Sequence, residues 1–192
     1  MVAVNSTMLP LGTVAPPIVL PDADGVVHTF DGATPAPATV VMFLSNHCPY
    51  VHHVARELGL LTQRWLARGV EVVGVMSNDT DAYPDDAPEH MGASARQWGW
   101  DFPYLVDADQ AVARAYRAAC TPDFFVFDAG RRLVYRGRFD ASRPSNDEPV
   151  TGADLRAAVD AVLAGGTPTD DQWPSMGCNI KWRPGAEPEW FG

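Results

Sequence analysis

Two short apolar runs with an amphipathic segment between them constrain the fold of this chain more than any other feature. The runs are ATVVMFLS, residues 38–45, and VEVVGVMS, residues 70–77. Neither alternates with polar residues, which is typical of a parallel strand buried on both faces. Apolar residues at spacings of three and four fill the segment between them: Val51, Val54, Ala55, Leu58, Leu61 and Trp65. The sequence therefore predicts two parallel strands joined by a helix in a right-handed crossover.

The chain continues with alternating helices and strands. Residues 78–90 are polar and contain proline, which predicts a surface loop, and a short helix that ends at Gly99 follows. We predict an extended segment over residues 102–109 and a helix over residues 110–119. The stretch DFFVFDAGRRLVYRGRFD, residues 123–140, is typical of a β-hairpin. This order indicates an α/β fold with a central mixed sheet flanked by helices.

A last helix and a tail follow the hairpin. Apolar residues recur at helical spacing over residues 155–163, and Thr151 with Asp154 offers a variant capping box in front of them. Residues 167–192 have little periodicity and contain three tryptophans, so we expect an irregular tail that wraps the domain. Of the 192 residues, 46% are hydrophobic and 20% charged, which predicts a single globular domain over residues 1–192.

The charge of the chain disfavours several classes of partner. A formal net charge of −10 argues against nucleic acid or an anionic membrane, because both attract clusters of Lys and Arg. No stretch approaches the roughly 18 uncharged apolar residues of a membrane-spanning helix. The first residues also lack the basic region and apolar run of a secretory signal. We therefore expect a cytoplasmic protein.

The octapeptide NHCPYVHH, residues 46–53, holds the main reactive candidate. Cys48 follows the first apolar strand and precedes Pro49. Because proline is favoured at the first position of a helix, Cys48 is predicted to be the N-cap. There the unpaired amides and the positive end of the helix dipole stabilise a thiolate. The thiolate attacks disulfides and peroxides, so we rank a nucleophile above a small buried cysteine.

Three histidines in the same octapeptide raise the alternative of a metal site. Cys48 and His52 are four residues apart and share a helical face, and His53 is another candidate ligand for copper or zinc. No Cys or His pair elsewhere has the spacing of metal ligands. We therefore expect no metal and no other cofactor, and keep a metal carrier as an alternative.

The second reactive stretch is CTPDFFVF, residues 120–127. Thr121 and Pro122 stand directly before a predicted strand, and a bond that precedes proline is the ordinary place for a cis peptide. Cys120 lies two residues before that proline. A trans turn proline beside an incidental cysteine is the simpler interpretation, and the residues alone leave both open.

Together these motifs resemble the thioredoxin-like superfamily. More narrowly, the chain is similar to the peroxiredoxin-like branch of the alkyl hydroperoxide reductase and thiol-specific antioxidant group. The likeness extends over nearly the whole chain: LGTVAPPIVLPDADG, SNDTDAYPDDAPEHM, FPYLVDADQAVARAY, LVYRGRFDASRP and PSMGCNIKW. The resemblance implies a thioredoxin-like fold with an N-terminal extension.

The resemblance also implies roles for single residues. Cys48 matches the first cysteine of the thioredoxin C-x-x-C pair, and Val51 stands at the second position. Pro122 matches the cis-proline that lies against the active cysteine, which would bring Cys120 close to Cys48. Ser45 matches the Ser or Thr found three residues before the peroxidatic cysteine of peroxiredoxins.

The leading hypothesis is thiol–disulfide exchange at Cys48, with Cys120 as the resolving thiol and Cys178 as the alternative resolver. The substrate would be a protein or small-molecule disulfide, with a cellular thiol as reductant. A peroxiredoxin-type peroxidase that reduces hydroperoxides is the first alternative, although Val41 stands where peroxiredoxins have proline. A redox-inert binding module is a further alternative. The sequence does not predict the oligomeric state.

Four residues are candidates for substrate contact: Thr121, Tyr50, Ser45 and Arg143. Tyr50 follows the helix-starting proline, so we expect it at the rim of the site. Arg143 could hold an anion or steady the thiolate, and an exposed loop position explains it equally well.

Overall fold

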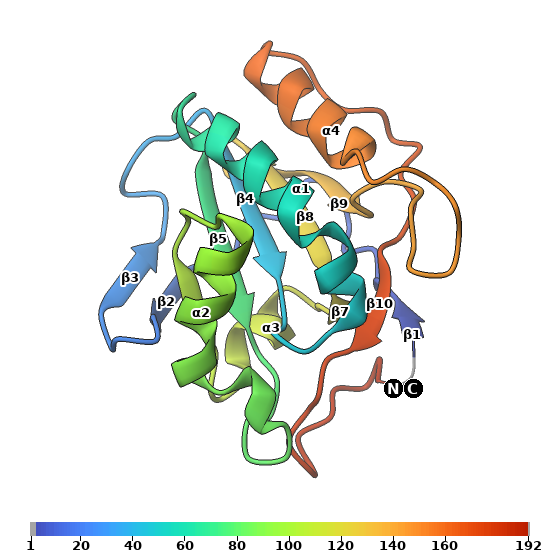
Figure 1. The fold of residues 1–192 in the computed structure, drawn as a ribbon. Coiled ribbons are helices and arrows are strands. Elements are labelled where there is room, and N and C mark those ends of the chain that lie inside the picture. Colours follow the sequence, from blue (N-terminus) through green and yellow to red (C-terminus); the bar gives the residue numbers. More distant parts are fainter. Residues whose placement is uncertain (1–2, 192) are drawn as a thin grey trace.

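The computed structural model describes residues 3–191 and is built on a central five-stranded sheet (Figure 1). Its strands lie in the order β6-β5-β4-β8-β9: Tyr104–Val106, Glu71–Met76, Ala38–Phe43, Asp123–Asp128 and Leu133–Gly137. Strands β4, β5 and β6 are parallel to one another. Strand β8 pairs antiparallel with β4, and β9 pairs antiparallel with β8. The predicted parallel pair, the hairpin and the mixed sheet are confirmed.

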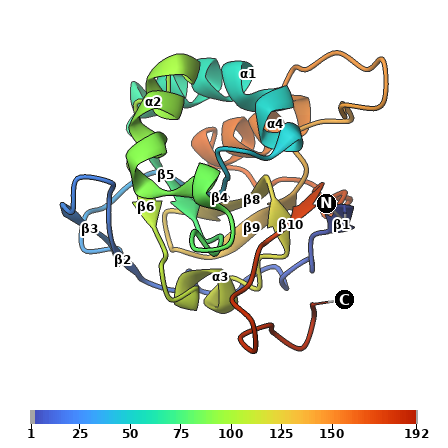
Figure 2. The same ribbon diagram turned by 60° about the horizontal axis from the view of Figure 1, so that its bottom comes forward.

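Helices cover both faces of this sheet. Figure 2 shows α1, α2 and α4 on one face and the short α3 on the other; they span Pro49–Leu66, Pro88–Trp98, Ala153–Leu163 and Ala111–Ala115. Both faces of β4 are buried, which explains why its sequence does not alternate with polar residues. Val40 and Met42 pack into the core beneath α1, while Val41 and Phe43 pack into the core beneath α3. Successive side chains of a strand point to opposite faces, and both faces are buried here.

Two predicted segments differ in extent from the structure. The loop over residues 78–90 contains a 3-10 helix, Pro84–Asp86, and its last residues already belong to α2. The helix predicted over residues 110–119 ends at Ala115. Arg117 has a φ of 51°, a left-handed conformation that an α-helix does not accommodate, so the chain turns into the next strand there.

The predicted capping box of the last helix is wrong. The N-cap is Gly152, which has a φ of 61°, and no side chain caps the helix. The Asp140 carboxylate accepts hydrogen bonds of 2.7 Å from the backbone amides of Thr151 and Gly152 instead. Asp154 forms an ion pair with Arg138. A carboxylate from a neighbouring loop thus holds the chain that enters α4, which no local motif reveals.

The tail is less irregular than predicted. It contains β10, Met176–Asn179, which lies between β1, Ala3–Asn5, and β7, Cys120–Thr121, in a small antiparallel sheet. Figure 1 shows this sheet beside the start of α1. An N-terminal hairpin of β2, Ile18–Pro21, and β3, Val27–Phe30, completes the strands of the described residues. None of the helices described is both long and apolar enough to cross a membrane.

Candidate functional site

Cys48 lies at the junction between the central sheet and α1. It is the N-cap of α1 with an extended backbone, φ −74° and ψ 119°, and Pro49 begins the helix, so the predicted N-cap is confirmed. The parallel strand β4 ends a few residues earlier, at Phe43. Ligands of α/β sheets collect beyond the carboxyl ends of such strands. The local sequence therefore places a thiol at the free amides of a helix start, in the region where α/β sheets hold their sites.

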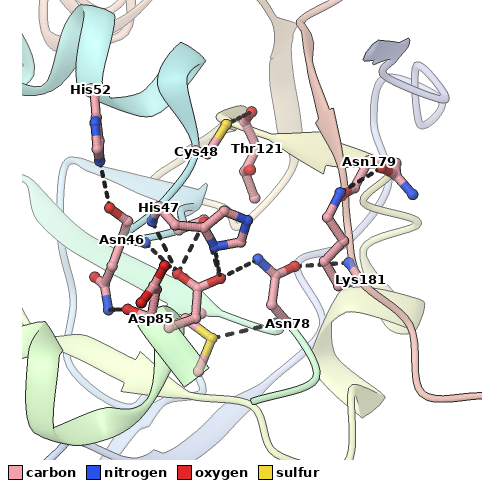
Figure 3. A network of polar contacts seen from close by, with 12 residues as sticks. Asn46, His47, Cys48, His52, Asn78, Asp85, Thr121, Asn179 and Lys181 are labelled. Carbon is pink, nitrogen blue, oxygen red and sulfur yellow. Dashed lines mark hydrogen bonds and ion pairs between the residues drawn. The ribbon is translucent and has the colours of Figure 1, made fainter. Parts of the chain in front are cut away.

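The thiol of Cys48 contacts the loop that carries Pro122. Its Sγ donates a hydrogen bond of 3.1 Å to the Thr121 carbonyl oxygen (Figure 3). The Thr121–Pro122 peptide bond is cis. The side-chain oxygen of Thr121 is buried and makes no hydrogen bond to another described residue in this arrangement. The Thr121 hydroxyl is therefore available as a donor when Cys48 becomes a thiolate.

Cys178 is the thiol that meets Cys48. In the antiparallel pair of β7 and β10, Cys178 lies opposite Thr121, so both residues share the face on which Cys48 lies. The side chains of Cys48 and Cys178 are hydrogen-bonded to each other. The backbone amide of Tyr50 donates to the Cys178 sulfur, which ties β10 to the first turn of α1.

The donors around Cys48 favour its ionised form. The hydrogen bond from the Cys178 side chain is the largest cause and lowers the pKa of Cys48 to about 6, against the opposing effect of burial. The Thr121 side chain and the backbone amides of Val51 and Cys178 lower it further. The same hydrogen bond and burial raise the pKa of Cys178 well above its usual range. The pair therefore ionises at Cys48 and keeps a proton at Cys178.

Cys120 occupies a different environment. It is buried, and its Sγ lies 3.6 Å from the carbonyl oxygen of Pro122. It is paired with Asn179 rather than with Cys178. Because neighbouring residues of a strand face opposite ways, Cys120 lies on the other side of β7 from Thr121. Burial raises the pKa of Cys120 well above its usual range, and Asp123 adds to the rise. The structure thus places Cys178, which the sequence ranked behind Cys120, beside Cys48.

A buried carboxylate that the sequence did not single out organises the approach to Cys48. Asp86 is fully buried and accepts hydrogen bonds from the Ser45 hydroxyl at 3.0 Å, the Asn46 amide at 2.6 Å and the Asn78 side chain at 2.6 Å. It also pairs with His47 Nδ1 at 2.7 Å. Asp86 lies in a proline-containing acidic stretch whose sequence predicts a surface loop. No spacing in the sequence distinguishes it from Asp85.

His47 directly precedes Cys48 and is ionisable. Its ring stacks on Tyr83 with centroids 5.7 Å apart. The hydrogen bond to Asp86 raises the pKa of His47, the charge of Cys48 adds to the rise, and Lys181 opposes it. In turn His47 lowers the pKa of Asp86, with burial opposing. A cationic His47 beside Cys48 is a further source of positive potential at the sulfur.

The predicted substrate residues lie at three places. Ser45 hydrogen-bonds Asp86, as described above. Tyr50 and Arg143 line a cavity beside the cis-proline, together with His53, Pro122 and Met176. Thr121 contacts Cys48 directly. Thr121 thus contacts Cys48, Tyr50 and Arg143 line the neighbouring cavity, and Ser45 supports the preceding loop.

The histidines of the metal alternative are engaged away from the sulfur. His52 Nε2 bonds to the Asn46 carbonyl oxygen, and His53 Nε2 lies 3.1 Å from the Ser142 hydroxyl. Within residues 3–191, no group of three or more His, Cys, Asp and Glu side chains is arranged to hold a metal ion.

The fold and the helix-capping cysteine define a protein of the thioredoxin-like class. The family model described as Redoxin matches residues 10–155, and the chain belongs to the redoxin family. The resemblance seen in the sequence is confirmed, and the chain is an oxidoreductase-type enzyme. A search of curated proteins found no match.

Solved structures agree with this assignment. An uncharacterized conserved protein from Geobacillus kaustophilus is 50% identical over 97% of this chain and 99% of its own, with a TM-score of 0.93. A hypothetical protein from Sinorhizobium meliloti 1021 is also 50% identical, over 94% and 99%, with a TM-score of 0.91. A putative thiol:disulfide interchange protein DsbE from Chlorobium tepidum is 19% identical over 81% and 99%, with a TM-score of 0.60. This last likeness shows a shared fold.

Proposed function

We propose that the protein catalyses thiol–disulfide exchange with Cys48 as the nucleophile and Cys178 as the resolving thiol. The observation that carries this proposal is the hydrogen bond between the two side chains. It lowers the pKa of the attacking thiol and raises the pKa of Cys178, so the second thiol stays protonated while Cys48 attacks. Cys120 takes no part in the cycle, because its sulfur lies on the other side of β7.

The cycle has two exchange steps. The Cys48 thiolate attacks a substrate disulfide, forms a mixed disulfide and releases one substrate thiolate, which takes up a proton. Cys178 then loses its proton and attacks the Cys48 sulfur, which forms the Cys48–Cys178 disulfide and releases the second substrate thiol. The substrate gains two electrons and the protein loses two. A cellular thiol reductant returns them by the reverse sequence, and at equilibrium the direction depends on the two reduction potentials.

Reduction of small hydroperoxides is a second candidate, and the complete burial of Cys48 favours it. The thiolate attacks the O–O bond, which gives a sulfenic acid on Cys48 and an alkoxide or hydroxide that takes up a proton. Condensation with the Cys178 thiol then forms the same disulfide and releases water. Both candidates share the two cysteines, so they differ in the oxidant and not in the residues.

Peptide mapping without reduction tests the proposal. Reduced protein is treated with one equivalent of a small disulfide in one arm and of hydrogen peroxide in the other. We expect a Cys48–Cys178 link, retained in Cys120→Ser and lost in Cys178→Ser. A link from Cys48 to Cys120 would remove Cys178 from the resolving role. Protein in which neither arm oxidises Cys48 would remove the proposed function itself.

A further inference from the structure

Strand β10 packs unusually closely against the cis-proline loop. A Cβ atom at Gly177 would lie 2.0 Å from the carbonyl oxygen and 2.7 Å from the carbonyl carbon of Thr121. Both are backbone atoms, which cannot rotate away as a flexible side chain does. Only glycine therefore allows the strand to reach this depth beside Thr121.

Further contacts hold β10 in place. On one side, Ala3 and Asn5 of β1 pair with Cys178 and Met176. Just before the strand, the Ser6 amide donates to the Ser175 carbonyl oxygen at 2.9 Å.

Beyond the strand, the tail is bonded to two loops. The Ile180 amide donates to Ala119 O at 3.0 Å, and the Lys181 amide donates to the Asn78 side chain at 2.8 Å. The strand is thus bonded along both edges and after its end.

The position of β10 closes the reactive sulfur to large molecules. Exposed fractions are 0% for Cys48, 2% for Thr121 and 3% for Cys178. An extended polypeptide can bind a protein by pairing with a free strand edge. Here the edge at Thr121 is already paired with the chain's own Cys178. A protein disulfide would have to displace the strand, whereas a molecule of a few atoms needs only a local opening.

We propose that β10 selects small oxidants, meaning hydroperoxides or low-molecular-weight disulfides, over protein disulfides, and that Gly177 determines this selectivity. The proposal rests on the proposed function, because it names the substrate class of that same site. Strand β10, which carries Cys178, would then have two roles. The same backbone segment supplies the resolving thiol and excludes bulky partners.

Alkylation with two reagents of one chemistry tests the proposal without any catalytic step. Reduced protein is treated with N-ethylmaleimide or with a maleimide carrying a polyethylene glycol chain, and the Cys48 peptide is quantified over time. Each rate is divided by the rate of the same reagent with free cysteine. For the wild type, we expect the polymer reagent to react with Cys48 at least tenfold more slowly. Equal normalised rates would overturn the proposal.

The variant Gly177→Ala tests the role of the glycine. The added methyl group forces β10 away from Thr121, so the normalised rate of the polymer reagent should approach that of N-ethylmaleimide. Gly92→Ala is the control, since its Cβ would meet only the flexible end of Arg96 at 3.3 Å, and it should behave as the wild type. A folded Gly177→Ala protein, checked by circular dichroism, with the wild-type rate ratio would refute the role of Gly177. If this variant fails to fold, the wild-type ratio alone decides whether the site is closed.

Oxidation assays separate this proposal from the proposed function. Wild-type protein is oxidised with hydrogen peroxide, with hydroxyethyl disulfide or with insulin, and the Cys48–Cys178 link is quantified. We expect one or both small oxidants to form the link at least tenfold faster than insulin. Equal rates with insulin would refute the selectivity while leaving the proposed cysteine pair intact. No link with any oxidant would refute the proposed function, and the alkylation ratio would still report whether the site is closed.

Discussion

The side chain of Cys178 hydrogen-bonds the sulfur of Cys48, which joins the strand of the C-terminal tail to the start of α1. Hydrogen bonds to charged groups contribute about 1.5–3 kcal/mol, and one pKa unit corresponds to about 1.4 kcal/mol. Cys178→Ala should therefore raise the pKa of Cys48 by about 1 to 2 units from its value of about 6.

The rate of alkylation at Cys48 as a function of pH measures this shift. Cys178→Ser keeps a donor at the position and should raise the pKa less than Cys178→Ala. Cys120→Ala should leave the profile unchanged. Identical profiles for Cys178→Ala and the wild type would mean that Cys178 does not stabilise the thiolate.

Asp86→Asn should lower the pKa of His47, because it removes the negative partner at 2.7 Å. Nuclear magnetic resonance of the His47 ring measures this titration directly. Asp85→Asn is a matched control, because Asp85 is exposed and only its backbone oxygen accepts a bond from Asn46. A His47 titration that is unchanged in Asp86→Asn would show that the ion pair does not govern this histidine.

The ion pair between His47 and Asp86 makes the stability of the protein depend on pH. The pKa of His47 is raised on folding, so its contribution is complete below about pH 6.5 and is lost as the pH rises through the folded value. The pKa of Asp86 is lowered, so its contribution is present above about pH 4 and is lost as the pH falls through the folded value. Asp86→Asn should therefore cost about 2 kcal/mol or more near pH 5.5 and less at pH 8, measured by urea unfolding.

Asp123 should make the protein less stable as the pH rises. Burial raises its pKa to about 7, from 3.8, so the folded state binds more protons than the unfolded state between these values. The free energy of unfolding should fall by up to about 1.4 kcal/mol per pH unit over this range. Asp123→Asn should remove this part of the dependence. The exposed Asp171→Asn should not, and equal pH profiles for both variants would contradict the assignment.

Two helical glycines offer a matched pair of stability tests. A Cβ at Gly59 would lie 2.2 Å from the carbonyl oxygen of Trp98, where α1 and α2 meet. Gly59→Ala should therefore lower the free energy of unfolding by about 1–3 kcal/mol through overpacking. Gly92→Ala, with only a flexible side chain nearby, should gain up to about 1 kcal/mol of helix propensity. Urea unfolding in which both variants are stabilised would contradict the close approach of the helices.

The sequence determined those parts of the protein that depend on local pattern. Apolar runs without alternation predicted β4 and β5, and apolar spacing predicted α1, because strands and helices expose side chains with fixed periods. Cys48 was predicted as the N-cap for a similar reason. The residue directly before a proline that begins a helix takes the N-cap position.

Only the tertiary structure decided which residues surround that cysteine. Cys120 and Thr121 are neighbours in β7, so their side chains point to opposite faces of the strand. Thr121 and Cys178 lie opposite each other and share the face of Cys48, while Cys120 lies on the other face. The tail had no periodicity to predict β10, since a four-residue strand owes its place to pairing with β1 and β7. Asp86 was missed for the same physical reason. Its role comes from hydrogen bonds to residues 45–47 and Asn78 that form only when the folded chain brings separate loops together.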